Sequence, residues 1–157
     1  MIGVRCCGVA STALAAAAVF LPGEQPAATG ASRSSDLVRV HAVRYIAHDG
    51  RPHRALVAVP AAYEPGRDPP IPLVIALHGR GATAESMLPR FGDLPAVGSF
   101  AVVSPEGQGR RLRRFSWGYS GQIDDLAKMP RIVERALPWL TVDRERVFAF
   151  GTSMGGQ

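Results

Sequence analysis

The chain has 157 residues, of which 46% are hydrophobic and 20% charged, and its formal net charge is +5. This composition fits one globular domain or part of a larger one, and it excludes a disordered chain. Lys128 is the only lysine, so the positive charge is almost all arginine. That skew points to coding bias more than to a nucleic-acid surface.

The first thirty residues differ from the rest. Arg5 precedes an almost uncharged run over residues 8–21 that is rich in Ala, Val and Leu, and small residues follow it. This layout predicts a secretory signal peptide over residues 1–30, cleaved after Gly30 or Ala31, because the apolar run is too short to span a membrane comfortably. We therefore expect a secreted or periplasmic protein with no stable membrane insertion after processing. An uncleaved membrane anchor is the alternative.

The two cysteines, Cys6 and Cys7, both fall within the predicted leader. The processed chain would then have no disulfide and no thiolate metal site, so its stability would rest on its core. We expect no metal and no cofactor.

Two strands are predicted after a flexible linker over residues 31–36, which is rich in serine. Alternating apolar and polar residues predict a strand from Leu37 to His48 and another from His53 to Val59, joined by a turn at residues 49–51. The residues expected to be buried in the first strand, after one slip of register, are Val38, Val40, Ala42, Tyr45 and Ile46. Tyr63 to Pro72 is proline-rich and predicts a loop.

The pattern then changes to continuous apolar runs. Leu73 to Leu77 predicts a strand buried on both faces, as in a parallel sheet covered by helices, and it ends in His78-Gly79-Arg80-Gly81. Ala82 to Phe91 predicts a helix with Thr83 as a possible N-cap. Ser99 to Ser104 predicts another buried strand.

The last part of the chain completes an α/β pattern. Gln108 to Tyr119 predicts a long polar and aromatic loop, and Ile123 to Leu140 has helical apolar spacing. Pro130 interrupts that helix, which predicts either a kink or a short first turn followed by a new helix. Arg146 to Phe150 predicts the final strand, so parallel crossovers are the expected topology.

This final strand leads into Gly151-Thr152-Ser153-Met154-Gly155, a G-x-S-x-G pattern. A strained turn between a strand and a helix can expose a serine Oγ, which becomes a nucleophile when a base takes its proton and backbone N–H groups stabilise the oxyanion. The alternative is a glycine-rich turn that happens to contain a serine.

These elements together resemble the N-terminal half of an α/β-hydrolase, and the resemblance covers residues 37–157. More narrowly, the 78–81 loop, the Ser-Trp-Gly-Tyr segment at 116–119 and residues 142–147 resemble exported esterase and depolymerase-like hydrolases and the catalytic domain of prolyl-oligopeptidase-type serine peptidases. The resemblance implies an α/β-hydrolase fold, a mostly parallel sheet with helices on both faces, truncated after the G-x-S-x-G turn.

The resemblance also implies roles for individual residues. Ser153 would be the nucleophile, and the backbone N–H groups of Met154 and Arg80 would form the oxyanion hole. The supporting residues would be His78, Gly79, Gly81, Gly151 and Gly155. In chain order the catalytic histidine and acid follow the serine, so we expect them beyond residue 157, and a chain that ends there would be inactive alone.

The other candidate residues receive less specific interpretations. His41, His48 and His53 are expected at the surface, and His78 is expected to orient the loop instead of acting as the base. Asp124 and Asp125 are expected to complement the dipole at the start of a helix.

Trp117, which lies between Phe115 and Tyr119, either forms a substrate platform or covers the edge of the core, and both interpretations stay open. The run Arg110-Arg111-Leu112-Arg113-Arg114 is too short to predict nucleic-acid binding. The Arg80 side chain is expected to be solvated.

The sequence thus predicts a secreted serine hydrolase that cleaves a small-molecule or polymeric ester through an acyl-enzyme on Ser153. A prolyl-oligopeptidase-like peptidase is the alternative within the enzymes. An alternative of another class is a non-catalytic α/β-hydrolase-like binding module or an inactive truncated product.

Overall fold

The computed structural model describes residues 34–111, 114–117 and 120–157. The chain divides between Ala31 and Ser32 into two units, and all described residues belong to the second. The predicted leader and residues 31–33 of the predicted linker lie outside the described residues. The rest of that linker enters a helical turn, α1 (Ser34–Leu37).

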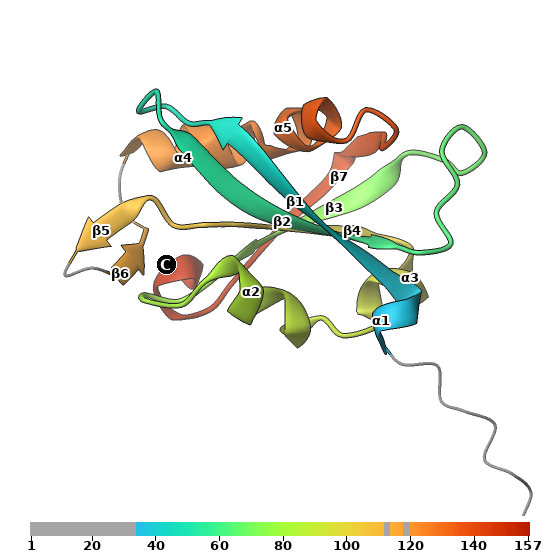
Figure 1. The fold of residues 1–157 in the computed structure, drawn as a ribbon, viewed down its shortest axis with the longest axis horizontal. Helices are drawn as coiled ribbons and strands as arrows, with labels where there is room; N and C mark the ends of the chain where they lie inside the picture. The colour runs from blue at the N-terminus through green and yellow to red at the C-terminus, as the bar shows by residue number, and fades with distance from the viewer. Residues whose placement is uncertain (1–33, 112–113, 118–119) are drawn as a thin grey trace, which may run out of the picture. The chain divides into compact units, whose positions relative to one another are not determined.

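A five-stranded sheet organises this unit, with the strand order β1-β2-β4-β3-β7 (Figure 1). The strands β1 (Val38–Ile46) and β2 (Pro52–Pro60) form the predicted antiparallel hairpin, and β2 also pairs antiparallel with β4 (Ala101–Pro105). The strand β3 (Ile71–Leu77) runs parallel to β4 and to β7 (Val142–Gly151). The predicted parallel arrangement of these three strands is confirmed.

Helices cover both faces of the sheet (Figure 1). One face carries α2 (Ala84–Met87), the 3-10 turn η1 (Leu88–Arg90) and α3 (Leu94–Gly98), the last of which the sequence pattern did not predict. The other carries α4 (Ser120–Ala127) and α5 (Met129–Ala136). Pro130 lies in the first turn of α5, where its missing N–H costs nothing. Of the two predicted alternatives, a new helix at this proline is therefore confirmed, and a kink in one continuous helix is not.

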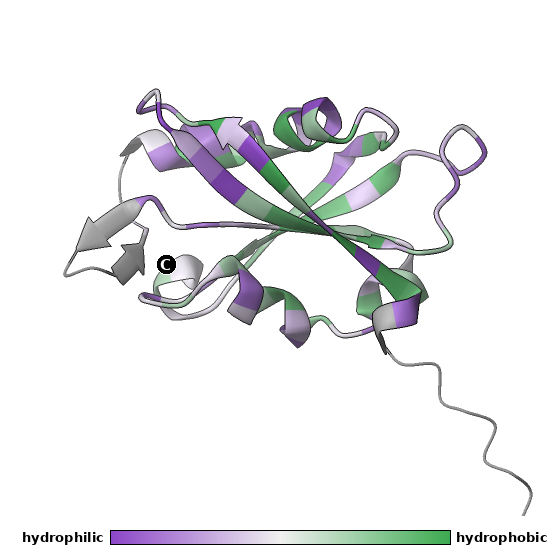
Figure 2. Ribbon diagram, in the orientation of Figure 1, coloured by the Kyte–Doolittle hydropathy of each residue, from purple (hydrophilic) through white to green (hydrophobic). Residues whose placement is uncertain are grey.

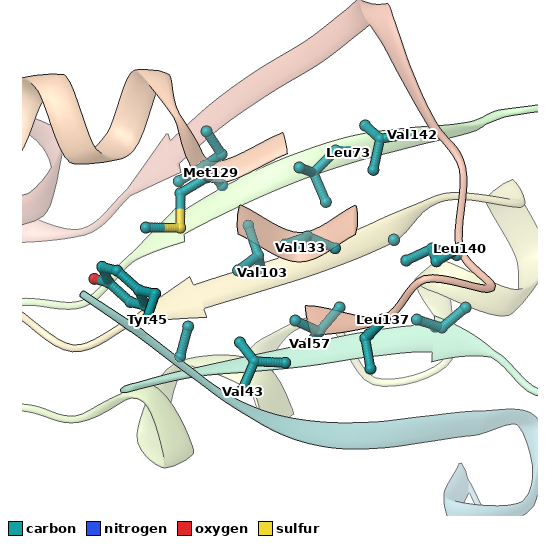
Figure 3. Packing of buried hydrophobic residues seen from close by; sticks show 14 of the residues in the cluster. Val43, Tyr45, Val57, Leu73, Val103, Met129, Val133, Leu137, Leu140 and Val142 are labelled. Atoms are coloured by element: carbon teal, nitrogen blue, oxygen red, sulfur yellow. The ribbon is translucent and has the colours of Figure 1, made fainter. Parts of the chain in front are cut away.

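The main core lies between the sheet and α5. Met129, Val133 and Leu137 pack over strand residues that include Val57, Leu73 and Val103 (Figure 3). A smaller cluster under α2 contains Ala58, Ala76, Met87 and Val102. Hydrophobic residues are concentrated in the central strands, whereas the tip of the β1–β2 hairpin is hydrophilic (Figure 2).

In β1 the predicted burial is wrong for Val40, Ala42 and Ile46, whereas Tyr45 is buried and Val38 is half-buried against the smaller cluster. The buried residues of β1 are Val43, Tyr45 and, just after the strand, Ala47, whereas Val40 is 56% and Ile46 68% exposed. The strand alternates without a slip, so every odd-numbered side chain from Val43 onward faces α5. Because β1 lies at the edge of the sheet, its other face is covered only in part, and apolar residues remain exposed there.

The predicted loop over residues 108–119 contains a small hairpin, β5 (Gly109–Arg111) and β6 (Arg114–Ser116), which forms a separate two-stranded sheet. Residues 112–113 and 118–119 lie outside the described residues, and the arginine run and Tyr119 fall partly or wholly there. Among the helices of the described part, none has the length and apolar character needed to cross a membrane.

Candidate active site

Ser153 lies where β7 ends. Thr152 is still extended, but Ser153 has a φ of 54°, in the left-handed region, and begins the 3-10 turn η2 (Ser153–Gly156). Non-glycine residues are rarely found in this region, and such strain is concentrated at functional sites. Ser153 is also exposed. The backbone turn therefore places the serine at the carboxyl end of β7, accessible to solvent.

The two glycines of the motif are required by close backbone contacts. A Cβ on Gly151 would lie 2.0 Å from the Gly155 carbonyl oxygen, and a Cβ on Gly155 would lie 2.5 Å from the Leu77 oxygen and 2.7 Å from the His78 oxygen. The turn thus folds back on its own strand and packs directly against the end of β3. Only residues without a side chain fit at both positions.

The loop after β3 lies beside the serine. A Cβ on Gly79 would be 3.4 Å from the Ser153 Cβ, which is ordinary van der Waals contact. The loop turns tightly, because the Ala82 N–H donates to the Gly79 oxygen (3.1 Å) and Gly81 has a φ of +75°. Arg80, at the tip of this turn, is exposed.

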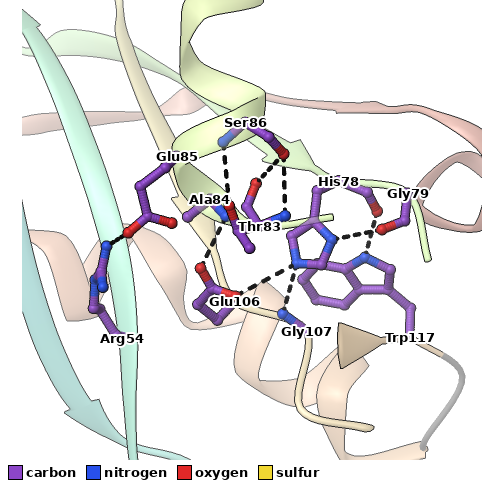
Figure 4. Close-up of polar contacts among 10 residues, drawn as sticks. All are labelled: Arg54, His78, Gly79, Thr83, Ala84, Glu85, Ser86, Glu106, Gly107 and Trp117. Atoms are coloured by element: carbon purple, nitrogen blue, oxygen red, sulfur yellow. Dashed lines mark hydrogen bonds and ion pairs between the residues drawn. The ribbon is translucent and has the colours of Figure 1, made fainter. Parts of the chain in front are cut away.

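His78 anchors this loop from within the core, where it is 1% exposed. The Gly107 N–H donates to His78 Nε2 (2.9 Å), so Nδ1 carries the ring proton and donates to the Gly79 oxygen (2.8 Å) (Figure 4). Both ring nitrogens are therefore occupied. Trp117 Nε1 donates to the His78 oxygen (2.7 Å), and its ring lies 5.1 Å from the imidazole.

Glu106 ties the end of β4 to the start of α2. Its Oε1 accepts from the Ala84 N–H (2.9 Å), while its buried Oε2 lies 3.9 Å from His78 Nε2 (Figure 4). The predicted N-cap Thr83 is confirmed, because its hydroxyl accepts from the Ser86 N–H and the Ser86 hydroxyl accepts from the Thr83 N–H. These bonds fix the segment that follows the 78–81 loop.

Asp125 does not have the position expected of it, whereas His48 is exposed, as expected. Asp125 lies in the second turn of α4, and its side chain is only 4% exposed, so it is not a dipole-complementing residue in a first turn. It accepts a hydrogen bond from His48 Nδ1 (2.7 Å), and this pairing holds His48 against the protein. The pattern also predicted Ile123 on the buried face, yet it is 71% exposed, because α4 turns its polar Asp125 inward.

The remaining histidines lie far from the serine. His41 is on β1, four strand positions from β7, which corresponds to roughly 19 Å. It is half-buried against Trp139, with ring centroids 5.3 Å apart, so the expectation of a surface position is wrong for it. His53 is on β2 and contacts Asp49 (3.3 Å). Within the described ranges, no three His, Cys, Asp or Glu side chains gather as a metal site would require.

Neither protein-family models nor curated protein sequences give a match to this chain. Solved structures do. The esterase of Pyrobaculum calidifontis matches with a TM-score of 0.55 at 23% identity over 74% of this chain and 36% of its own. A bacterial heroin esterase matches with a TM-score of 0.56 at 21% identity, over 80% of this chain and 38% of its own. A ferulic acid esterase matches with a TM-score of 0.55 at 18% identity, over 75% of this chain and 50% of its own.

The described residues therefore adopt the α/β-hydrolase fold, as the sequence resemblance predicted. The chain spans about a third to a half of the length of the solved structures that it matches.

Several residues of this site were missed by the sequence reasoning. Glu106 and Gly107 directly follow the buried strand β4. A polar residue in that position could have indicated a site residue at the end of the strand. The pairing of His48 with Asp125 has no local signal, because the two residues are 77 positions apart.

Proposed function

We propose that the protein is a serine hydrolase that cleaves carboxylic esters through an acyl-enzyme on Ser153. The observation that carries the proposal is the left-handed backbone of this exposed serine, held by two obligatory glycines beside the 78–81 loop. The esterases that share the fold support the same class of reaction.

In the proposed reaction, a base removes the Ser153 proton as Oγ attacks the ester carbonyl carbon. The carbonyl oxygen becomes an oxyanion, and the N–H groups of Arg80 and Met154 would stabilise it; one such donor is worth about 3 kcal/mol. Collapse of this intermediate breaks the bond to the alcohol, which leaves with the proton. Water then hydrolyses the acyl-enzyme by the same steps and releases the acid.

The base is proposed to be a histidine that follows Ser153 in the chain, oriented by an acid. His78 has both ring nitrogens engaged, and His41 and His53 lie on strands three or more positions from β7. His48 follows β1, the edge strand opposite β7, and its Nδ1 is bonded to Asp125. None of these four fits the role.

The test is labelling of the intact gene product with a fluorophosphonate, which reacts with activated serines. Wild type is expected to label, and Ser153→Ala is expected to lose the label while keeping a wild-type circular dichroism spectrum. A wild-type protein that folds but does not label would favour a non-catalytic module. Comparing p-nitrophenyl esters with proline-containing peptide amides would then separate an esterase from a peptidase.

Export is proposed from the leader alone. Expression of the whole gene with secretion of the product is expected to give a mature N-terminus at Ala31 or Ser32, determined by N-terminal sequencing. Retention of residues 1–30 on a membrane-bound product would instead indicate an anchor.

A further inference from the structure

Asp125 connects three parts of the fold that are distant in the sequence. Its carboxylate accepts hydrogen bonds from the His48 N–H (3.0 and 3.2 Å), from His48 Nδ1 (2.7 Å) and from Gln108 Nε2 (2.7 Å). A buried carboxylate is costly unless it is fully hydrogen-bonded, and these donors meet that need. Burial alone would raise the pKa of Asp125, but the bonds from Gln108 and His48 outweigh it and hold this pKa below its usual value.

On one side, the carboxylate holds the end of the β1–β2 hairpin. The His48 imidazole lies directly against α4, because a Cβ on Gly121 would be 1.9 Å from His48 Cδ2. Burial raises the pKa of the nearby Tyr45 phenol to about 12, and the negative charge of Asp125 adds to the rise. This side of the cluster ties the hairpin to the helix.

On the other side, the carboxylate holds Gln108, the residue next to Gly107. Because a carboxylate only accepts, it fixes the Gln108 amide with its NH₂ group toward Asp125. The adjacent Gly107 N–H is the group that donates to His78 Nε2. His78 in turn holds the Gly79 oxygen, and Gly79 lies beside Ser153, since a Cβ on Gly79 would be 3.4 Å from the Ser153 Cβ.

We propose that Asp125 is a positioning residue for the 78–81 loop, which it controls through Gln108 and the Gly107 peptide. The inference rests on the proposed function only in its effect on turnover, since the hydrogen bonds exist without substrate. Loss of the Asp125–Gln108 bond would free the segment after β4, and the Gly107 N–H would no longer select the Nδ1–H tautomer of His78. The loop donors would then be misaligned with the oxyanion.

The test compares Asp125→Ala, Gln108→Ala and His48→Ala in the intact gene product. The first two break the link toward Gly107, and His48→Ala is the matched control because it breaks only the hairpin link. We expect the first two to lower kcat by about ten- to a hundredfold with KM within about twofold, since misplacement near 1 Å has effects of this size. His48→Ala is expected to keep kcat within about twofold and to lower only the melting temperature.

A second measurement is independent of activity. In protein with nitrogen-15 in its histidines, at a pH of about 8 where histidine is ordinarily neutral, the two ring nitrogens of His78 are expected to give separate signals of a protonated Nδ1 and an unprotonated Nε2. Gln108→Ala and Asp125→Ala should draw these signals together, and His48→Ala should not.

Unchanged His78 signals in folded Gln108→Ala protein would overturn the proposal, as would equal kcat losses in all three variants. If Asp125→Ala does not fold, Gln108→Ala decides alone, because Gln108 lies in a loop. If wild type shows the predicted His78 signals but no ester hydrolysis, the proposed function fails while the positioning role is still decided by the spectra.

Discussion

Replacement of Gly155 by alanine is the sharpest test of the geometry around Ser153. The added Cβ would lie 2.5 Å from the Leu77 oxygen, whereas ordinary contact begins at 3.4 Å, so the two groups would have to separate by 0.9 Å (3.4 − 2.5). The contacted atom is a backbone carbonyl, and it accepts a hydrogen bond from the Thr152 N–H (3.1 Å). It cannot rotate away as a side chain would.

Two costs follow from this displacement. Overpacking of this kind typically costs about 1–3 kcal/mol, and weakening the Thr152 bond adds about 1 kcal/mol, so we expect a loss of roughly 2–4 kcal/mol in the free energy of unfolding. If the turn shifts instead of the strand, Ser153 moves by almost 1 Å relative to the Arg80 donor on the 78–81 loop. The rate of fluorophosphonate labelling should then fall by about a hundredfold.

The measurements are urea unfolding and the labelling rate of the folded protein. Gly79→Ala is the matched stability control, because its Cβ would meet only ordinary contacts at 3.4 and 3.5 Å, and its free energy of unfolding should change by less than about 1 kcal/mol. Wild-type unfolding together with a wild-type labelling rate in Gly155→Ala would refute the close packing of this turn against β3.

Two further predictions concern the sheet and the buried carboxylate. Val43→Ala should lower the free energy of unfolding by about 1–3 kcal/mol, because Val43 is 3% exposed. Ile46→Ala should change it by less than about 0.5 kcal/mol, because Ile46 is 68% exposed. If urea unfolding showed the larger loss for Ile46→Ala, the slipped register predicted from the sequence would be the correct one. The lowered pKa of Asp125 means that its ionised form stabilises the fold above its ordinary pKa of 3.8, and that this contribution disappears as the pH falls through the lower folded value. The stability difference between wild type and Asp125→Asn should therefore be constant above a pH of about 5 and shrink below about 4, and a constant difference down to about pH 3 would contradict it.

Features with a local cause were predictable from the sequence. In the apolar run 73–77, Leu73, Ile75 and Ala76 are buried and the other two residues half-buried, and Thr83 caps α2 with its own hydroxyl. Gly151 and Gly155 were recognised from their spacing, and the structure supplies the reason, which is backbone contact at both positions. Each of these signals lies within a few residues of the element that it determines.

Features set by distant contacts were not predictable in the same way. Whether the odd or the even side chains of β1 are buried depends on α5, which packs on only one face of that edge strand. The inward side of α4 carries Asp125 because His48 and Gln108 supply donors from other parts of the chain. Hydrophobic periodicity therefore placed Ile123 on the wrong side of α4. A pattern of apolar residues cannot predict that a polar residue is buried when its hydrogen-bond partners come from distant parts of the chain.

The supports of the 78–81 loop follow the order of the parallel strands. Because β4, β3 and β7 are adjacent and parallel, their carboxyl ends meet at one edge of the sheet. Gly107 after β4 holds His78 after β3, and the end of β3 in turn receives Gly155 after β7. Each strand end thus supports the next one toward the serine. Substitutions that disturb the end of β4 should therefore affect Ser153 even though β4 does not pair with β7.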